Sequence, residues 1–253
     1  DFKTKINNFN LNSNFSLNSF DLDKFKKSFS INSEISTILN SENQTNKKKE
    51  TKLSLFGNYR DKVWNGSLGE KEIISAYGVK MIKANNWEKN NIIKSSTIAA
   101  SYGDYQSSDR KDSLKVINRE RLNIFLDRKH SYTIWKQKTS NFINNENIYS
   151  PTVVPSSLNI NAQAKIDLYR YSDNNYQDLF IFRLGPELTI GNFKNKLFDY
   201  TKISIYKKTT FANGNSPFGF DQSTDNDTFE LNLKQQLFGP ITIDYKTEYN
   251  LDS

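Results

Sequence analysis

Strict alternation of apolar and polar side chains over residues 158–168 constrains the fold of this chain more than any other feature. Successive side chains of a β-strand point to opposite faces, so this segment has one apolar and one polar face. A half-buried strand of a soluble sandwich can show that pattern. A strand of an outer-membrane barrel can show it too, with lipid in place of the core, and the run reaches the length of about 9–11 residues that a transmembrane strand needs. The apolar face consists of Leu158, Ile160, Ala162, Ala164, Ile166 and Leu168.

Similar alternating segments recur along the whole chain and predict an all-β protein with roughly eleven strands. They cover residues 9–17, 29–36, 53–59, 73–81, 92–102, 122–126 with an edge piece at 132–134, 158–168, 180–190, 200–211, 229–237 and 241–251. No long amphipathic helix is expected, and the best short helical candidate is Asp21–Ser30. We therefore expect antiparallel strands joined up and down.

The connections add to this expectation. Gly239 and Pro240 interrupt two alternating segments, because Gly allows unusual φ values and Pro lacks the amide hydrogen that a ladder needs. Residues 229–251 should therefore form an adjacent antiparallel pair that turns there. Long polar links are expected at 40–50, 141–156 and 212–227. Short turns on one rim and long loops on the other are typical of an outer-membrane barrel.

The chain reads as one β domain over residues 1–253, with Asn-rich strands and a polar loop in 1–50 and barrel strands in 51–253. It opens with Asp1 and ends directly after a strand, which would leave an unpaired edge. We therefore expect an incomplete fragment of a larger transmembrane β-barrel.

Composition excludes several classes of function. There is no Cys, so neither a disulfide nor a thiolate metal site is expected. The one His, His130, lies in a charged run without a nucleophile motif, so we expect no catalytic activity and no cofactor. The net charge is +7, but the basic residues are spread along the chain rather than gathered in a stripe, which disfavours nucleic acid as a partner.

Four kinds of residue remain as candidates for a special role. Asp221, Asp225 and Asp227 share a loop with Ser223, but the Gly and distal Glu of a calcium loop are missing, so a solvated turn is favoured. Glu187 lies on the polar side of its strand and should face a lumen. Trp64, Trp87 and Trp135 could form an interfacial girdle or pack in a core, and they could also stack on sugars. Pro186 lies inside a strand pattern, where it either weakens the ladder or marks a bulge.

Three longer stretches resemble a known family. They are YRDKVWNGSLGEKEIISAYG (59–78), LFDYTKISI (197–205) and a third that runs from SPFGFD at 216 through QQLFGPITIDYKTEYNLD, ending at 252. Together they resemble the C-terminal region of cyanobacterial outer-membrane proteins related to the organic-solvent-tolerance, LPS-assembly barrels (OstA/LptD type), over residues 50 to 253. The resemblance implies a barrel in the outer membrane of a Gram-negative, cyanobacteria-like bacterium that passes lipopolysaccharide or a related lipid to the outer leaflet. It further implies a periplasmic lipid-transport bridge and a plug lipoprotein as partners. The inter-domain disulfides of the enteric proteins have no counterpart here.

Three hypotheses stay open. The first is a barrel for lipid export and envelope assembly, with its apolar faces pointing outward and a weak seam between strands. The second is a secreted or surface β-rich module that binds glycans, with its apolar faces packed inward on a shared core. The third, a barrel enzyme acting on lipids or sugars, would need a buried nucleophile and base.

Overall fold

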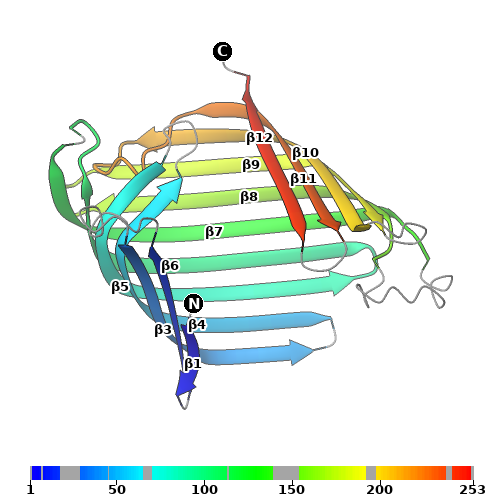
Figure 1. Cartoon of the computed structure of the whole chain (residues 1–253), viewed down its shortest axis with the longest axis horizontal. Coiled ribbons are helices and arrows are strands. Elements are labelled where there is room, and N and C mark those ends of the chain that lie inside the picture. Colours follow the sequence, from blue (N-terminus) through cyan, green and yellow to red (C-terminus); the bar gives the residue numbers. More distant parts are fainter. Residues whose placement is uncertain are drawn as a thin grey trace.

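The structure is a computed structural model that describes residues 2–6, 8–17, 29–44, 46–64, 70–112, 114–138, 154–191, 198–237 and 241–251. Twelve strands form one sheet in the order β1 to β12, and each strand pairs antiparallel with the next along the chain (Figure 1). The strands are β1 (Phe2–Ile6), β2 (Phe9–Leu17), β3 (Phe29–Gln44), β4 (Lys47–Trp64), β5 (Glu70–Lys89), β6 (Ile92–Ser108), β7 (Val116–Lys136), β8 (Ser157–Tyr171), β9 (Tyr176–Gly191), β10 (Phe198–Gly214), β11 (Asn226–Leu237) and β12 (Thr242–Asn250). The expected all-β, antiparallel, up-and-down architecture is confirmed.

The sheet is strongly curled. In Figure 1 the central strands form a wall, and strands from both ends of the order, among them β1 and β12, cross in front of it. Residues of strands from β2 to β8 line a single cavity on the enclosed side. Among the described residues, no ladder joins β1 to β12. In that part of the chain, no helix is both long and apolar enough to cross a bilayer.

Several sequence-based boundaries are wrong. The short strand β1 was not expected, and the pieces at 122–126 and 132–134 belong to one strand, β7, with an irregularity between Thr133 and Trp135. The polar link expected at 40–50 is a tight hairpin of β3 and β4 instead. Its strands continue because polar side chains pair across it, as Glu42 does with Lys49 at 3.2 Å. Of the helical candidate 21–30, Phe29 and Ser30 belong to β3, and the rest lies outside the described residues.

The connections alternate between two ends of the sheet. We call the end with the β1–β2, β3–β4, β5–β6, β7–β8, β9–β10 and β11–β12 connections the turn rim, and the opposite end the loop rim. Residues 137–156 join β7 to β8 at the turn rim, whereas residues 215–225 join β10 to β11 at the loop rim. The expectation that all long loops share one rim is therefore wrong.

The last hairpin is confirmed. The ladder of β11 and β12 runs from Thr228 opposite Asn250 to Gln236 opposite Thr242, and the amide of Leu237 donates to the carbonyl of Ile241 at 3.0 Å. One face carries the apolar residues that the alternation predicts, namely Phe229, Leu231, Leu233, Ile243 and Tyr245. Gly239 and Pro240 lie outside the described residues.

Pro186 interrupts the ladder between β9 and β10. Glu187 pairs with Ser204 and Leu184 with Lys207 in one constant register, but Gly185 and Pro186 have no ladder partner on β10. This is a gap in the ladder rather than a bulge, in agreement with the missing amide hydrogen of Pro. That the gap weakens a seam is still a prediction.

Gly185 lets the backbones approach closely at this gap. A Cβ atom at Gly185 would lie 1.9 Å from the carbonyl oxygen of Ile205, whereas a Cβ at Gly57 would meet nothing within 4 Å. We expect Gly185→Ala to lower the free energy of unfolding by about 1–3 kcal/mol through overpacking, and the matched Gly57→Ala change to leave it nearly unaltered. Urea titration of both variants measures the difference, and equal effects would contradict the close approach.

Candidate functional site

The sheet has two faces of opposite character. On β9, Phe180, Phe182 and Leu184 alternate with Leu179, Gln177 and other buried or half-buried residues. We call the face that carries the exposed apolar side chains the outer face, and the face that lines the cavity the inner face. Each side chain of a ladder shares its face with the residue directly opposite, so the faces can be followed from strand to strand.

The six apolar residues of β8 lie on the outer face. Ile166 is opposite Leu126 of β7 and Phe180 of β9, and Ala164 is opposite Phe182. Phe180 and Phe182 are 40% and 52% exposed, whereas Asp167, on the inner face, is 4% exposed. The apolar face thus points away from the enclosed side.

Ion pairs within and between strands lie on the inner face. Lys165 contacts Asp167 at 2.7 Å, Lys202 contacts Glu187 at 3.0 Å, and Arg183 contacts Glu230 at 2.6 Å. Lys52 pairs with Glu34, which also accepts a hydrogen bond from Ser54 at 2.7 Å. Glu187 therefore faces inward, as its place on the polar side of the strand predicts.

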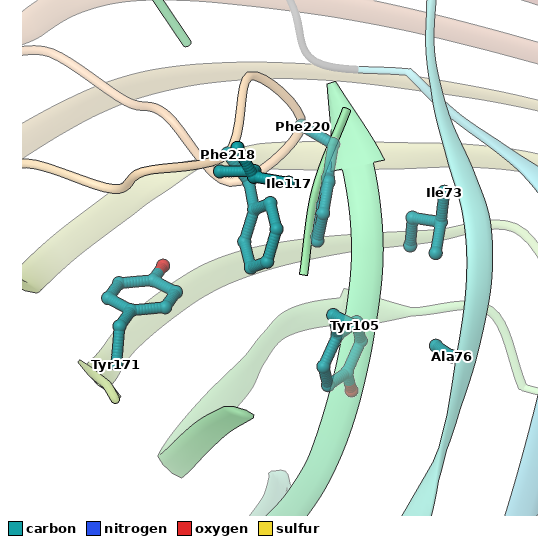
Figure 2. Packing of buried hydrophobic residues seen from close by; sticks show 7 residues of the cluster. All are labelled: Ile73, Ala76, Tyr105, Ile117, Tyr171, Phe218 and Phe220. Carbon is teal, nitrogen blue, oxygen red and sulfur yellow. The ribbon is translucent and has the colours of Figure 1, made fainter. Parts of the chain in front are cut away.

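Residues 215–225 fold onto the inner face, and we call them the inserted loop. Phe218 and Phe220 are 0% and 6% exposed. Their rings stack with centroids 5.1 Å apart, and Phe218 meets Tyr171 edge-on with centroids 5.9 Å apart. Burying a Phe side chain contributes about 1.5–3 kcal/mol to the free energy of unfolding. The cluster consists of Ile73, Ala76, Tyr105, Ile117, Tyr171, Phe218 and Phe220 (Figure 2).

Backbone hydrogen bonds fix the inserted loop to the loop rim. The amide of Arg110 donates to Pro217 at 2.8 Å, and the amide of Asn215 donates to Tyr176 at 2.6 Å. The Arg110 guanidinium also donates to the side chain of Asn215. The β6–β7 connection and the start of β9 thus hold the loop in place.

A buried ion pair joins the inserted loop to the middle of the sheet. The Arg121 guanidinium contacts both carboxylate oxygens of Asp221, at 2.6 and 2.8 Å, and the hydroxyl of Tyr171 donates to the same carboxylate at 3.0 Å. The Arg121 and Asp221 side chains are 13% and 7% exposed. Arg121 also lies 3.9 Å from the centroid of the Tyr105 ring.

Two glycines make room beneath this pair. Gly78 and Gly103 are directly opposite each other, and the row continues to Phe56 on one side and to Arg121 on the other. A Cβ atom at Gly78 would lie 2.9 Å from the Phe56 ring, and one at Gly103 would lie 3.0 Å from it. The absence of side chains lets Phe56 lie across β5 and β6 towards Tyr105, with ring centroids 6.1 Å apart.

The cavity beside these residues has a volume of about 520 Å³. Its wall is rich in amide side chains, including Asn12, Asn32 and Asn123, and also contains Tyr105 and Tyr169. Arg121, Glu34 and Lys80 bring charge to it. The wall therefore offers hydrogen-bonding partners to a polar ligand or to water beside apolar side chains such as Phe56, Ile82 and Phe125.

The three loop aspartates have separate partners. Asp221 binds Arg121, Asp225 accepts from the amide of Ala212 at 2.6 Å, and Asp227 contacts Lys207 at 3.2 Å. In the described ranges, no group of three His, Asp or Glu side chains could hold a metal ion. The expectation of a solvated turn is wrong for Asp221, because its side chain is 7% exposed and paired with Arg121.

A second loop-rim pair is more open. Arg119 contacts Asp173 at 3.0 Å, with side chains 37% and 23% exposed. Burial raises the pKa of Asp173, but hydrogen bonds from Arg119 and Asn175 outweigh it, so the pKa lies below its ordinary value. This pair provides a comparison for the buried one.

The remaining candidates lie on the outer face or outside the described side chains. His130 is exposed on β7, directly opposite Lys94 and Ala162. Trp87 is half-buried and Trp135 is 50% exposed, and the side chain of Trp64 lies outside the described residues. Arg121, Phe218 and Phe220 were not singled out from the sequence. The one sequence signal for this cluster is the presence of Phe218 and Phe220 in an otherwise polar link.

The exposed apolar band runs obliquely across the strands. We call a row of directly opposed residues on successive strands a rung. One outer rung starts at Leu55 of β4 and continues through Val79, Tyr102, Leu122 and Arg170 to Tyr176 of β9. The exposed apolar stretch of β9 is centred near Leu184, eight residues beyond Tyr176. The centre of the band thus moves about 26 Å along the strands while it crosses five strand spacings of about 4.8 Å. The band is therefore inclined by about 45–50° to the direction perpendicular to the strands.

No curated protein and no solved structure shows a significant similarity to the chain. One family model matches it over residues 1–253, and its description is "Protein of unknown function (DUF3769)". A match over this range shows the family: this curled antiparallel sheet, with its apolar outer face and inserted loop, belongs to the DUF3769 family.

Proposed function

We propose that the chain forms the wall of an outer-membrane β-barrel that helps to carry lipopolysaccharide or a related lipid to the outer leaflet. The observation that carries the membrane part is the exposed apolar band on the outer face. Its slope of about 45–50° is close to the strand tilt of 35–45° in outer-membrane barrels. A flat hydrocarbon layer crossed by tilted strands requires such an oblique band.

The two faces support the same proposal. A sandwich would bury its apolar side chains between sheets, whereas large apolar side chains on most strands here are exposed on the outer face. The inner face carries the ion pairs and amide groups that a water-filled lumen tolerates. This speaks against the soluble glycan-binding module.

The lipid part rests on the resemblance to LPS-assembly barrels. A lipid exporter needs a lumen that accepts a polar headgroup and a seam through which acyl chains leave. The polar cavity supports the first requirement, and the ladder gap at Pro186 supports the second. A periplasmic bridge protein would deliver the lipid, and a plug lipoprotein would meet the lumen beside the inserted loop.

Depletion of the protein in its own bacterium tests this function. We expect the protein to fractionate with the outer membrane, and newly made lipopolysaccharide to become inaccessible to surface labelling as the protein is lost. Re-expression of the wild-type chain should restore the labelling. Normal surface lipopolysaccharide after complete depletion would contradict the export role, and a protein found only in soluble fractions would contradict the membrane wall.

A further inference from the structure

The outer face of β4–β6 becomes basic towards the turn rim, where the apolar band has moved away. One rung places Lys47, Trp87, Lys94 and His130 directly opposite one another. The next rung towards the middle contains Lys49, Asn85, Ser96 and Arg128. We call Lys47, Lys49 and Lys94 the basic patch. Arg128 is not part of it, because it is directly opposite Ala164 in the middle of the apolar stretch of β8.

The charges of the basic patch are open to solvent. Lys47 and Lys94 are exposed, and none of the ion pairs among the described residues involves them. Lys49 pairs with Glu42 at 3.2 Å. Asp127, which follows Leu126 in β7, points to the inner face, where Gln163 donates to it at 2.9 Å. The patch therefore has a positive excess.

Aromatic side chains accompany the patch. The Lys94 ammonium lies 5.1 Å from the centroid of the Trp87 ring. Tyr132 and Trp135 of β7 are 52% and 50% exposed, further towards the turn rim. Trp and Tyr favour the interface between hydrocarbon and headgroups, and cations on this level meet lipid phosphates.

We propose that the basic patch binds the phosphate groups of anionic phospholipids in the leaflet at the turn rim. This inference rests on the proposed membrane wall. Towards β8 and β9 the same rungs carry Ala162, Ala164, Phe182 and Leu184, so acyl chains would lie against β8 and β9 while headgroups reach the cations of β4 and β6. The outer face near the turn rim would therefore prefer anionic phospholipids beside β4 and β6.

Quenching of Trp87 by brominated lipids tests the proposal. The full chain with Trp64→Phe and Trp135→Phe, which keeps Trp87, is reconstituted into phosphatidylcholine vesicles that contain phosphatidylglycerol. Either the phosphatidylglycerol or an equal amount of phosphatidylcholine is brominated. We expect brominated phosphatidylglycerol to associate about fivefold more strongly, the factor that one cation near an anionic surface contributes, and the preference to fall at high salt.

Matched variants locate the effect. In the same background, Lys47→Gln with Lys94→Gln should abolish the preference. Lys111→Gln with Lys115→Gln, which removes two exposed charges at the loop rim, should preserve it. Lys49→Gln with Lys94→Gln is a second patch variant in case the first does not fold, as judged by circular dichroism.

Each other outcome has a separate meaning. Equal quenching by both lipids in the parent chain, or a preference that survives both patch variants, overturns the phosphate site but leaves the membrane wall intact. Absence of quenching by either brominated lipid overturns the membrane wall and, with it, this inference.

Discussion

Replacing Asp221 with Asn is expected to lower the free energy of unfolding by about 3–5 kcal/mol, because it leaves the buried Arg121 charge without its partner. The two side chains are nearly the same size, so the change removes charge rather than volume. The Arg121 side chain is 13% exposed and cannot move to solvent without disturbing the aromatic cluster. Urea titration of the reconstituted chain, followed by tryptophan fluorescence, measures the loss.

Two controls isolate the buried pair. Asp173→Asn removes the more open partner of Arg119, two residues from Arg121 in β7, and should cost at most about 1 kcal/mol. The double change Arg121→Met with Asp221→Leu removes both charges and should stay within about 1 kcal/mol of the wild type, as apolar replacements of buried pairs often do. If Asp221→Asn and Asp173→Asn cost the same, the inserted loop is not anchored by this pair.

Introducing Arg at Ala164 should cost about 2–4 kcal/mol when the chain folds into lipid vesicles, since Ala164 lies in the middle of the apolar stretch of β8. Arg at the adjacent Gln163 should have almost no effect, because that side chain lies on the inner face and could pair with Asp127, which Gln163 now binds at 2.9 Å. Folding titrations into vesicles measure both costs, and equal costs at the two positions would contradict the outward orientation.

A neighbouring charge needs its own control. Arg128 is directly opposite Ala164 on the outer face, so repulsion between two guanidinium groups could contribute to the effect. Repeating Ala164→Arg in an Arg128→Gln background removes that repulsion. The cost should remain near its original size if lipid causes it, and should largely vanish if repulsion does.

Local patterns predicted most of the fold. Alternation with a period of two appears within a single strand, so it identified the face of Leu158 to Leu168 and ten further strands without knowledge of their neighbours. It missed β1, which is only five residues long. It also misjudged residues 40–50, because polar pairs such as Glu42 and Lys49 stabilise a strand without any apolar alternation.

The sequence by itself therefore determined that the protein is an antiparallel β-sheet with one apolar and one polar face, because side-chain direction in a strand is a local property. Only the tertiary structure decided which residues meet across it. Arg121 and Asp221 are a hundred residues apart in the chain, and their contact depends on the path of the inserted loop. The oblique apolar band and the basic patch likewise depend on the register of successive strands, which joins Lys47 to Lys94 and His130 through β5. Such alignments arise from non-local pairing, which no single segment encodes.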